Sequence, residues 1–165
     1  MANSFIVGDT KNQIIKDFIK DDEIIQALNP QGITLENSEK LVNKYIFNFA
    51  QNPITLNEVQ TFITVQTNIT NRHFANNRYV DSSVEIWIIS HEDNMVVDNV
   101  PKITENRNDY LSRLIDSKLN GSRRFGTGEL VLTKNVEGAI QKDWLYRCLV
   151  FEVTDINDSF CKSWE

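Results

Sequence analysis

The chain has 165 residues, of which 41% are hydrophobic and 24% are charged, and its formal net charge is −6. This composition is that of an ordinary globular protein and excludes a disordered or fibrous chain. One hydrophobic core suffices for this length, so we expect a single domain over residues 1–165. The acidic balance argues against nonspecific attachment to nucleic acid phosphates or anionic lipid surfaces.

Cysteine usage and the N-terminus bear on where the protein folds. Cys148 lies in an apolar run and Cys161 in the C-terminal tail, and neither belongs to a Cys-x-x-Cys cluster. We therefore expect reduced thiols and folding in a cytoplasm. No basic region precedes a long apolar run at the N-terminus, so no secretory signal is predicted. No segment approaches the roughly 18 apolar residues that a membrane span requires.

The N-terminal region is predicted to be helical. Thr10 and Gln13 have the spacing of a capping box, which places the start of a helix at Thr10. Apolar residues then recur at helical spacing, with a break that leaves a short second piece before Asn29. These apolar residues are Ile14, Ile15, Phe18, Ile19, Ile24, Ile25 and Leu28. A second helix is favoured over residues 35–49, although residues 45–49 alone could be extended.

Two strands are predicted next. Residues 58–69 alternate between apolar and polar positions, which is the pattern of a strand with one wet face. Phe62 breaks the alternation and is predicted to cover something on the opposite face. Residues 80–91 are apolar on both faces at positions 86–89, which is typical of a strand near the centre of a sheet. The polar residues 92–105 are predicted to form a loop.

The last third predicts one helix and two further strands. The helix is capped by Asn106 or Asn108 and ends at Gly121, where a left-handed backbone conformation costs glycine little. Strands are predicted at residues 128–135 and 144–154. The predicted fold class is α+β: N-terminal helices and an antiparallel four-stranded sheet with one helix packed across it, in the order α, α, β, β, α, β, β.

No residue pattern in the chain predicts catalysis. His73 and His91 lack the further ligands at short, regular spacing that a zinc site requires. A Ser-His-Asp triad, which converges only in space, stays open, but no Gly-x-Ser-x-Gly elbow marks a nucleophile. Asp116 and Lys118 have the acidic-x-Lys spelling of a metal-dependent nuclease, yet positions i and i+2 of a helix point to different sides. We therefore expect no enzyme, no catalytic, cofactor-binding or metal-binding residue, and no cofactor.

Two basic and aromatic segments are the candidates for contacts with partners. Residues 71–79 connect the first two strands; such a segment can stack on single-stranded bases, but the acidic remainder of the chain favours a protein interface. Residues 120–128 are rich in glycine but follow a helix and lead into a strand, the wrong order for a phosphate loop. Arg123 and Arg124 are expected to pair there with acidic groups of a neighbouring subunit. The predicted interface residues are Arg72, His73, Phe74, Arg78, Arg123, Arg124 and Phe125.

Five segments cover most of the chain with a pattern known from one family. They are IIKDFIKDDEIIQAL at 14–28, KYIFNF at 44–49, VEIWIISH at 84–91, and residues 109–128 and 146–157. In order and spacing they resemble the tail terminator, or tail-completion, family of head-to-tail joining (neck) proteins from long-tailed bacteriophages. That family is expected to have a proline soon after Tyr-Ile-Phe, where this chain has asparagine, and the departure leaves the end of the second helix open.

The resemblance implies a structural protein of the virion, made in the host cytoplasm. It implies a ring of six subunits that caps the tail tube, joins it to the filled head and lets genomic DNA pass without sequence-specific binding. The implied partners are other copies of the chain, the tail tube protein and a head-closure or adaptor protein, with no membrane contact. The family supplies no catalytic or cofactor residue. The alternative is a head-closure or adaptor protein on the portal complex, and a more distant one is a small metal-dependent nuclease.

Overall fold

The computed structural model describes residues 3–55, 58–72, 79–125 and 128–156. Its α-helices are α1 (Asn3–Phe18), α2 (Asp22–Leu28) and α3 (Arg107–Leu119). Its 3-10 helices are η1 (Leu35–Leu41), η2 (Pro53–Thr55) and η3 (Glu92–Asn94). Its strands are β1 (Ile46–Phe47), β2 (Thr61–Arg72), β3 (Tyr79–His91), β4 (Val131–Gln141) and β5 (Trp144–Ile156).

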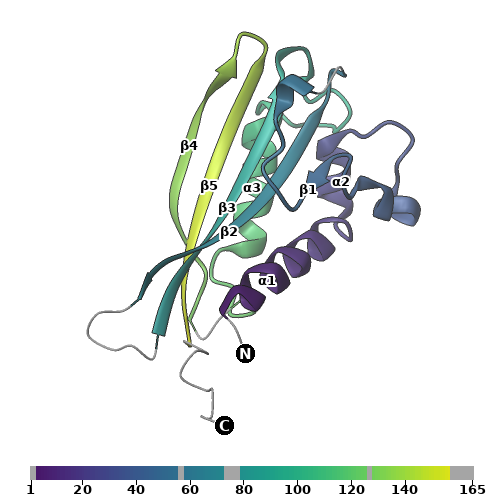
Figure 1. The fold of residues 1–165 in the computed structure, drawn as a ribbon. Coiled ribbons are helices and arrows are strands. Elements are labelled where there is room, and N and C mark those ends of the chain that lie inside the picture. The colour runs from purple at the N-terminus through teal and green to yellow at the C-terminus, as the bar shows by residue number, and fades with distance from the viewer. Residues whose placement is uncertain (1–2, 56–57, 73–78, 126–127, 157–165) are drawn as a thin grey trace.

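The five strands form a mixed, mostly antiparallel sheet in the order β1-β2-β3-β5-β4. Only the two-residue β1 runs parallel to its neighbour. Helices α1, α2 and α3 lie on one face of the sheet, which we call the inner face (Figure 1). The predicted α+β class is confirmed, whereas the sheet has one strand more than predicted and is not purely antiparallel.

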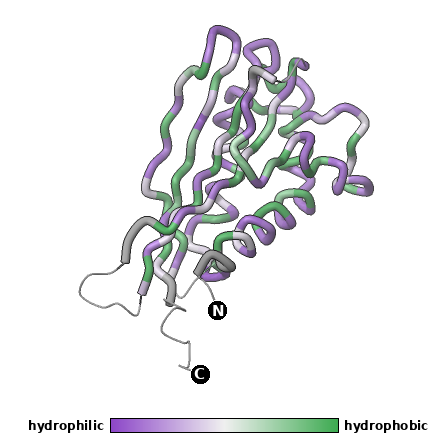
Figure 2. The backbone as a smooth tube through the Cα atoms, in the orientation of Figure 1, coloured by the Kyte–Doolittle hydropathy of each residue, from purple (hydrophilic) through white to green (hydrophobic). Residues whose placement is uncertain are grey.

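The main hydrophobic core lies between the helices and the inner face. Alternate residues of β2, β3 and β5 point into it, and Figure 2 shows hydrophobic positions along these strands and along the helices. Removing such apolar surface from water is the dominant stabilising term of the fold. Fully buried members include Ile14, Phe18, Ile24, Ile63, Ile86, Leu111, Ile115, Leu149 and Phe151.

A smaller aromatic cluster covers one end of the opposite, outer face. Phe62 of β2 is fully buried there with Phe47, Ile89 and Trp144. Its ring meets Phe47 and Trp144 edge to face, with ring centroids 5.7 and 5.9 Å apart. The prediction that Phe62 covers the second face of the sheet is therefore confirmed.

Helix α1 begins earlier than predicted. It starts at Asn3, so Thr10 lies inside the helix and is buried, and the predicted capping box is wrong. The Gln13 amide donates to the Asp9 carboxylate at 2.6 Å, an ordinary pair of helix neighbours four residues apart. The predicted second piece is α2, whose first turn donates from the Ile24 amide to Asp21 at 3.1 Å.

The helix predicted over residues 35–49 is wrong beyond Leu41. The chain forms the 3-10 helix η1, turns at Asn43 with a positive φ of 63°, and then enters β1. Asparagine tolerates this left-handed conformation, which no helix can continue through. Tyr45 and the two residues of β1 are buried together, and the Ile63 amide of β2 donates to the Tyr45 carbonyl at 2.8 Å. The extended alternative for Tyr-Ile-Phe therefore holds.

Helix α3 forms as predicted. The Asn106 side chain accepts from the Asp109 amide at 2.9 Å and caps the first turn. Leu111, Ile115 and Leu119 are fully buried on the face toward the sheet. Gly121 follows the helix with a φ of 78°, as a glycine at this position permits.

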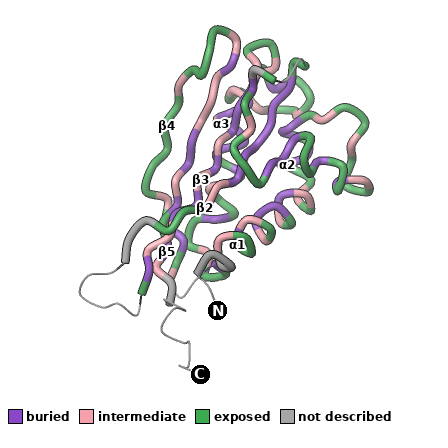
Figure 3. The backbone as a smooth tube through the Cα atoms, in the orientation of Figure 1, coloured by how far each residue is buried: buried purple, intermediate pink, exposed green. Residues whose placement is uncertain are grey.

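Strand β4 is longer than predicted and forms one edge of the sheet. No β4 residue is buried, and Figure 3 shows the strand exposed along nearly its whole length. Its pairing with β5 shifts register between Leu132 and Lys134 and again between Ala139 and Gln141. Such bulges interrupt the regular ladder of an edge strand.

The glycine of β4 gives a testable packing prediction. A Cβ atom on Gly138 would lie 2.8 to 2.9 Å from the ring and hydroxyl of Tyr146, which in turn packs on Trp87 with ring centroids 5.0 Å apart. Gly138→Ala should therefore displace an aromatic ring and lower the free energy of unfolding by about 1–3 kcal/mol. Gly8→Ala is the matched control, because a Cβ atom at this position of α1 meets nothing within 4 Å. This substitution should raise the free energy of unfolding by up to about 1 kcal/mol. Urea unfolding measures both changes, and equal responses would contradict the prediction.

Candidate functional site

The first predicted interface segment lies mostly outside the described residues. His73, Phe74 and Arg78 fall there, so the structure does not place them. Arg72 ends β2, where its backbone pairs with Val80 of β3. The prediction of an interface at this hairpin therefore stays a prediction.

The second predicted segment is held by its own chain. Arg123 pairs with Glu129 at 2.6 Å, and Arg124 pairs with Asp17 of α1 at 2.7 Å. The expectation that both arginines are free for a neighbouring subunit is wrong in this respect. Phe125, predicted as an exposed aromatic, is buried in the main core, with the Arg124 guanidinium 5.6 Å from its ring centre. The segment fastens the end of α3 to α1.

His91 and Lys118, two of the residues weighed for catalysis, make structural contacts. The His91 Nδ1 atom accepts from the Asp93 amide at 3.2 Å, and its ring packs edge to face on Trp144. The Lys118 ammonium group pairs with the Asp21 carboxylate at 2.5 Å and not with Asp116, which agrees with the geometric objection to an Asp116–Lys118 pair. Within the ranges that the structure describes, no three His, Cys, Asp or Glu side chains gather in a metal-binding group.

A buried polar network joins four elements at one end of the sheet. The Thr61 and Ser90 hydroxyls are 2.7 Å apart, and Ser90 donates to Asn108 of α3 at 2.6 Å. Asn94 donates to Thr61 at 2.9 Å. The hydroxyls of Thr61 and Ser90 are fully buried, and their partners are amides and each other, with no basic group to activate them. The network fixes α3 and η3 on the sheet and was missed because its members are far apart in sequence.

Polar contacts also attach β4 to the rest of the protein. Asn135 donates to Ser112 of α3 at 3.3 Å, and the Leu132 amide donates to Asn120 at 3.1 Å. Arg147 of β5, mostly buried, pairs with Asp109 of α3 and with Glu137 of β4. Apart from Leu132, which packs against the main core, β4 is attached to the helices by polar contacts, and it presents an uncovered edge.

Some of the exposed apolar side chains lie on the two opposite sides of the sheet. On β4 they are Val131, Val136 and Ile140. On the other side, Phe49 and Val59 belong to the segment that links β1 to β2. Phe49 borders a hollow of about 480 Å³, which Glu58 and Gln60 also line. These two sides of the sheet each offer apolar surface for contact with another protein chain.

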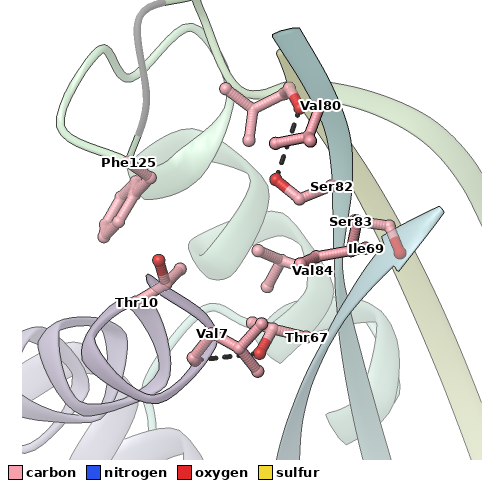
Figure 4. A pocket seen from close by; sticks show the side chains of 10 residues that line it. Val7, Thr10, Thr67, Ile69, Val80, Ser82, Ser83, Val84 and Phe125 are labelled. Atoms are coloured by element: carbon pink, nitrogen blue, oxygen red, sulfur yellow. Dashed lines mark hydrogen bonds between the residues drawn. The ribbon is translucent and has the colours of Figure 1, made fainter. Parts of the chain in front are cut away.

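The small cavity in Figure 4 lies between α1 and the inner face. Its walls are mainly apolar, with Val7, Val80, Val84 and Phe125 around it, and its volume is about 10 Å³. Thr67 donates across one side to the Val7 carbonyl at 2.9 Å. A volume near that of one water molecule is far below the roughly 300 Å³ of a small-ligand site. The cavity is a packing gap under α1.

Cys148 gives a prediction about pH. Burial, with a smaller contribution from Glu85, raises the pKa of its thiol from 9.0 to about 11, although Lys134 lowers it. Below pH 9 the thiol is protonated in both states; between pH 9 and 11 it ionises only in the unfolded chain, so stability falls. Cys148→Ser should remove up to about 2 kcal/mol of that fall. Urea unfolding from pH 8 to 10.5 measures it, and parallel curves for the two proteins would contradict it.

No helix among the described residues is long and apolar enough to cross a lipid bilayer.

A protein family model matches most of the chain. No curated protein and no solved structure matches the chain. The YomW family model matches residues 12–153, a range that runs from inside α1 to the last third of β5 and so contains both candidate edges. The chain therefore belongs to the YomW family.

Proposed function

We propose that this protein is a structural subunit of the phage neck, a tail terminator that forms a ring, caps the tail tube and joins it to the DNA-filled head. The observation that carries the proposal is the uncovered β4 edge together with the exposed apolar side chains of the segment that links β1 to β2. A rigid sheet backed by helices offers these surfaces for contacts while its core stays independent of them. The resemblance of the sequence to tail terminators supplies the role.

The attachment of β4 favours this use of the edge. A strand bonded to the sheet on one side only exposes backbone donors and acceptors together with its side chains. Here the edge also carries three exposed apolar side chains, Val131, Val136 and Ile140. A contact with another chain would remove this surface from water.

The charge of the chain suits a DNA passage. A net charge of −6 repels phosphate groups rather than holding them. A ring of such subunits would let the genome move through without sequence-specific binding. This part of the proposal needs acidic side chains on the inner wall of the ring.

Electron microscopy of tail tubes tests the proposal. Tubes assembled from purified tube protein should acquire extra density at one end and stop growing when this protein is added. Isolated portal complexes form the second arm, because a head-closure or adaptor protein would bind them in preference to tube ends. A protein that leaves tube ends bare and tube lengths unchanged would contradict the terminator role.

A further inference from the structure

We infer that copies of this chain associate head to tail, with the β4–β5 hairpin of one copy entering the hollow beside β1 of the next. This inference deepens the proposed function by naming the two surfaces of the ring contact. The hairpin contributes Val136, Ile140 and Lys142, and the hollow contributes Phe49, Glu58 and Gln60. Its occupant is a second copy of the chain.

The two surfaces lie at the same end of the sheet but on opposite sides. His91 of β3 pairs with Trp144 of β5, which pairs with Gln141 at the end of β4. The His91 amide also donates to the Gln60 carbonyl at 3.1 Å, which extends the same row to the start of β2. One row across the sheet therefore ends at the hairpin turn on one side and at the hollow on the other. Copies placed side by side would bring these two surfaces together at one level.

The chemistry of the two surfaces is complementary. Val136 and Ile140 on the hairpin, and Phe49 at the hollow, are each more than a third exposed. Lys142 is exposed at the hairpin turn, and Glu58 is exposed at the hollow. Apolar surface thus faces apolar surface, and a cation faces a carboxylate. The one lysine that lines the hollow, Lys44, lies 5.4 Å from the ring centre of Tyr45.

Gln60 is a buried polar residue beside the hollow. Its side chain is 6% exposed and lines the hollow, and its Oε1 atom is buried without a hydrogen-bond partner among the described residues. The oxygen is closed to solvent, so a donor of a neighbouring copy could reach it only if the Gln60 side chain turned toward the hollow. In the contact we infer, the Lys142 ammonium group of the neighbouring copy therefore pairs with the exposed Glu58 carboxylate.

The bulges of β4 favour this arrangement over a two-fold contact. Pairing of β4 with β4 of another copy would need a regular ladder, which the register shifts at both ends of the strand interrupt. It would also leave the hollow empty. A head-to-tail contact uses a different surface on each copy and closes into a ring when the rotation permits.

Charge reversal tests the inference, with sedimentation velocity on the full chain and no tube protein present. Wild type should self-associate, and Lys142→Glu or Glu58→Lys alone should weaken association about tenfold or more, because each places like charges together. The double variant should recover association. An equal mixture of the two single variants should recover it too, since every alternating contact again joins a lysine to a glutamate. Lys16→Glu, at an exposed site on α1, is the control and should behave as wild type.

Three results would overturn the inference. They are a wild type that stays monomeric at its highest soluble concentration, single variants that associate as wild type does, and a mixture that stays weak. Loss of association in Lys142→Glu but not in Glu58→Lys would instead indicate a two-fold contact through β4. The tube-capping experiment is separate, so capping without this contact would sink the inference alone, and association without capping would sink the terminator role alone.

Discussion

Arg107→Met should lower the free energy of unfolding by about 3–5 kcal/mol, one of the two largest effects we expect from a single substitution. Arg107 is fully buried, and its guanidinium donates to the carbonyls of Ala27 and Asn94 at 2.6 Å and of Val96 at 2.7 Å. Methionine fills similar volume but donates nothing, so three carbonyl groups lose their donor inside the protein. Since small domains are stable by only about 5–15 kcal/mol, this loss is a large fraction of the total.

The contacts of Arg107 explain why it contributes strongly to the stability of the fold. It fastens the loop before α3 to the last turn of α2, whose carbonyls have no partner within that helix. Burial lowers the pKa of the Arg107 guanidinium, and the charge of Asp98 acts in the opposite direction. An arginine remains protonated in a protein, so the cation is buried and depends on its acceptors.

Urea unfolding of three variants separates this role from a general helix effect. Arg107→Lys keeps the charge but replaces the planar fork with one nitrogen, and it should still lose about 2–3 kcal/mol. Arg113→Met on the same helix is the control, because Arg113 is exposed and pairs with Glu105 at 3.0 Å, a contact worth at most about 1 kcal/mol. Similar losses at positions 107 and 113 would contradict the account.

Nothing in the sequence marks Arg107 for this role. An arginine in the first turn of a helix is ordinarily solvated, and its acceptors come from segments 80, 13 and 11 residues away. The pairing of Arg124 with Asp17 spans 107 residues and could not be predicted from the sequence either. Sequence patterns indicate periodicity and local capping. The burial of Arg107 depends instead on how distant loops fold around it, which no local pattern contains.

The elements that the sequence predicted well are those with periodicity and a local stop signal together. Helix α3 has an apolar stripe, an asparagine cap and a glycine end, and all three are present in the structure. The predicted start of α1 was wrong because Thr10 and Gln13 have the spacing of a capping box although both lie inside a longer helix. The helix prediction for the region that carries β1 was wrong because Leu41, Tyr45 and Ile46 fit a helical stripe. The left-handed turn at Asn43 depends on tertiary packing, which the local pattern does not report.

The candidate surfaces were only partly within reach of sequence reasoning. Exposed arginines and aromatics suggested residues 123–125, and Phe125 proved to be part of the core. Strand β4 was predicted, but its place at the edge depends on the strand order, which no local pattern encodes. The hollow needs β1 to lie beside β2, so the wrong prediction for residues 42–49 concealed it.

Phe62→Ala should lower the free energy of unfolding by about 3–5 kcal/mol, because a fully buried ring would leave a cavity on the outer face. The ring is the centre of a chain of edge-to-face contacts that runs from Phe49 through Phe47 to Trp144 and His91. Its removal breaks the link between the segment that carries β1 and the strands β3 and β5. Urea unfolding measures the loss, and a double-mutant cycle with Trp144→Leu should show a coupling of about 0.5–1.5 kcal/mol.

Phe49→Ala is the control for Phe62→Ala and connects the fold to the proposed assembly. Phe49 is the outermost ring of the same chain but is 46% exposed, so its removal should cost no more than about 1 kcal/mol of stability. Its exposed face borders the hollow, and the same substitution should therefore weaken self-association. Phe49→Ala that unfolds as easily as Phe62→Ala would make Phe49 a core residue and remove it from the contact. A stable Phe49→Ala protein that associates as wild type does would show that the hollow binds its neighbour without this ring.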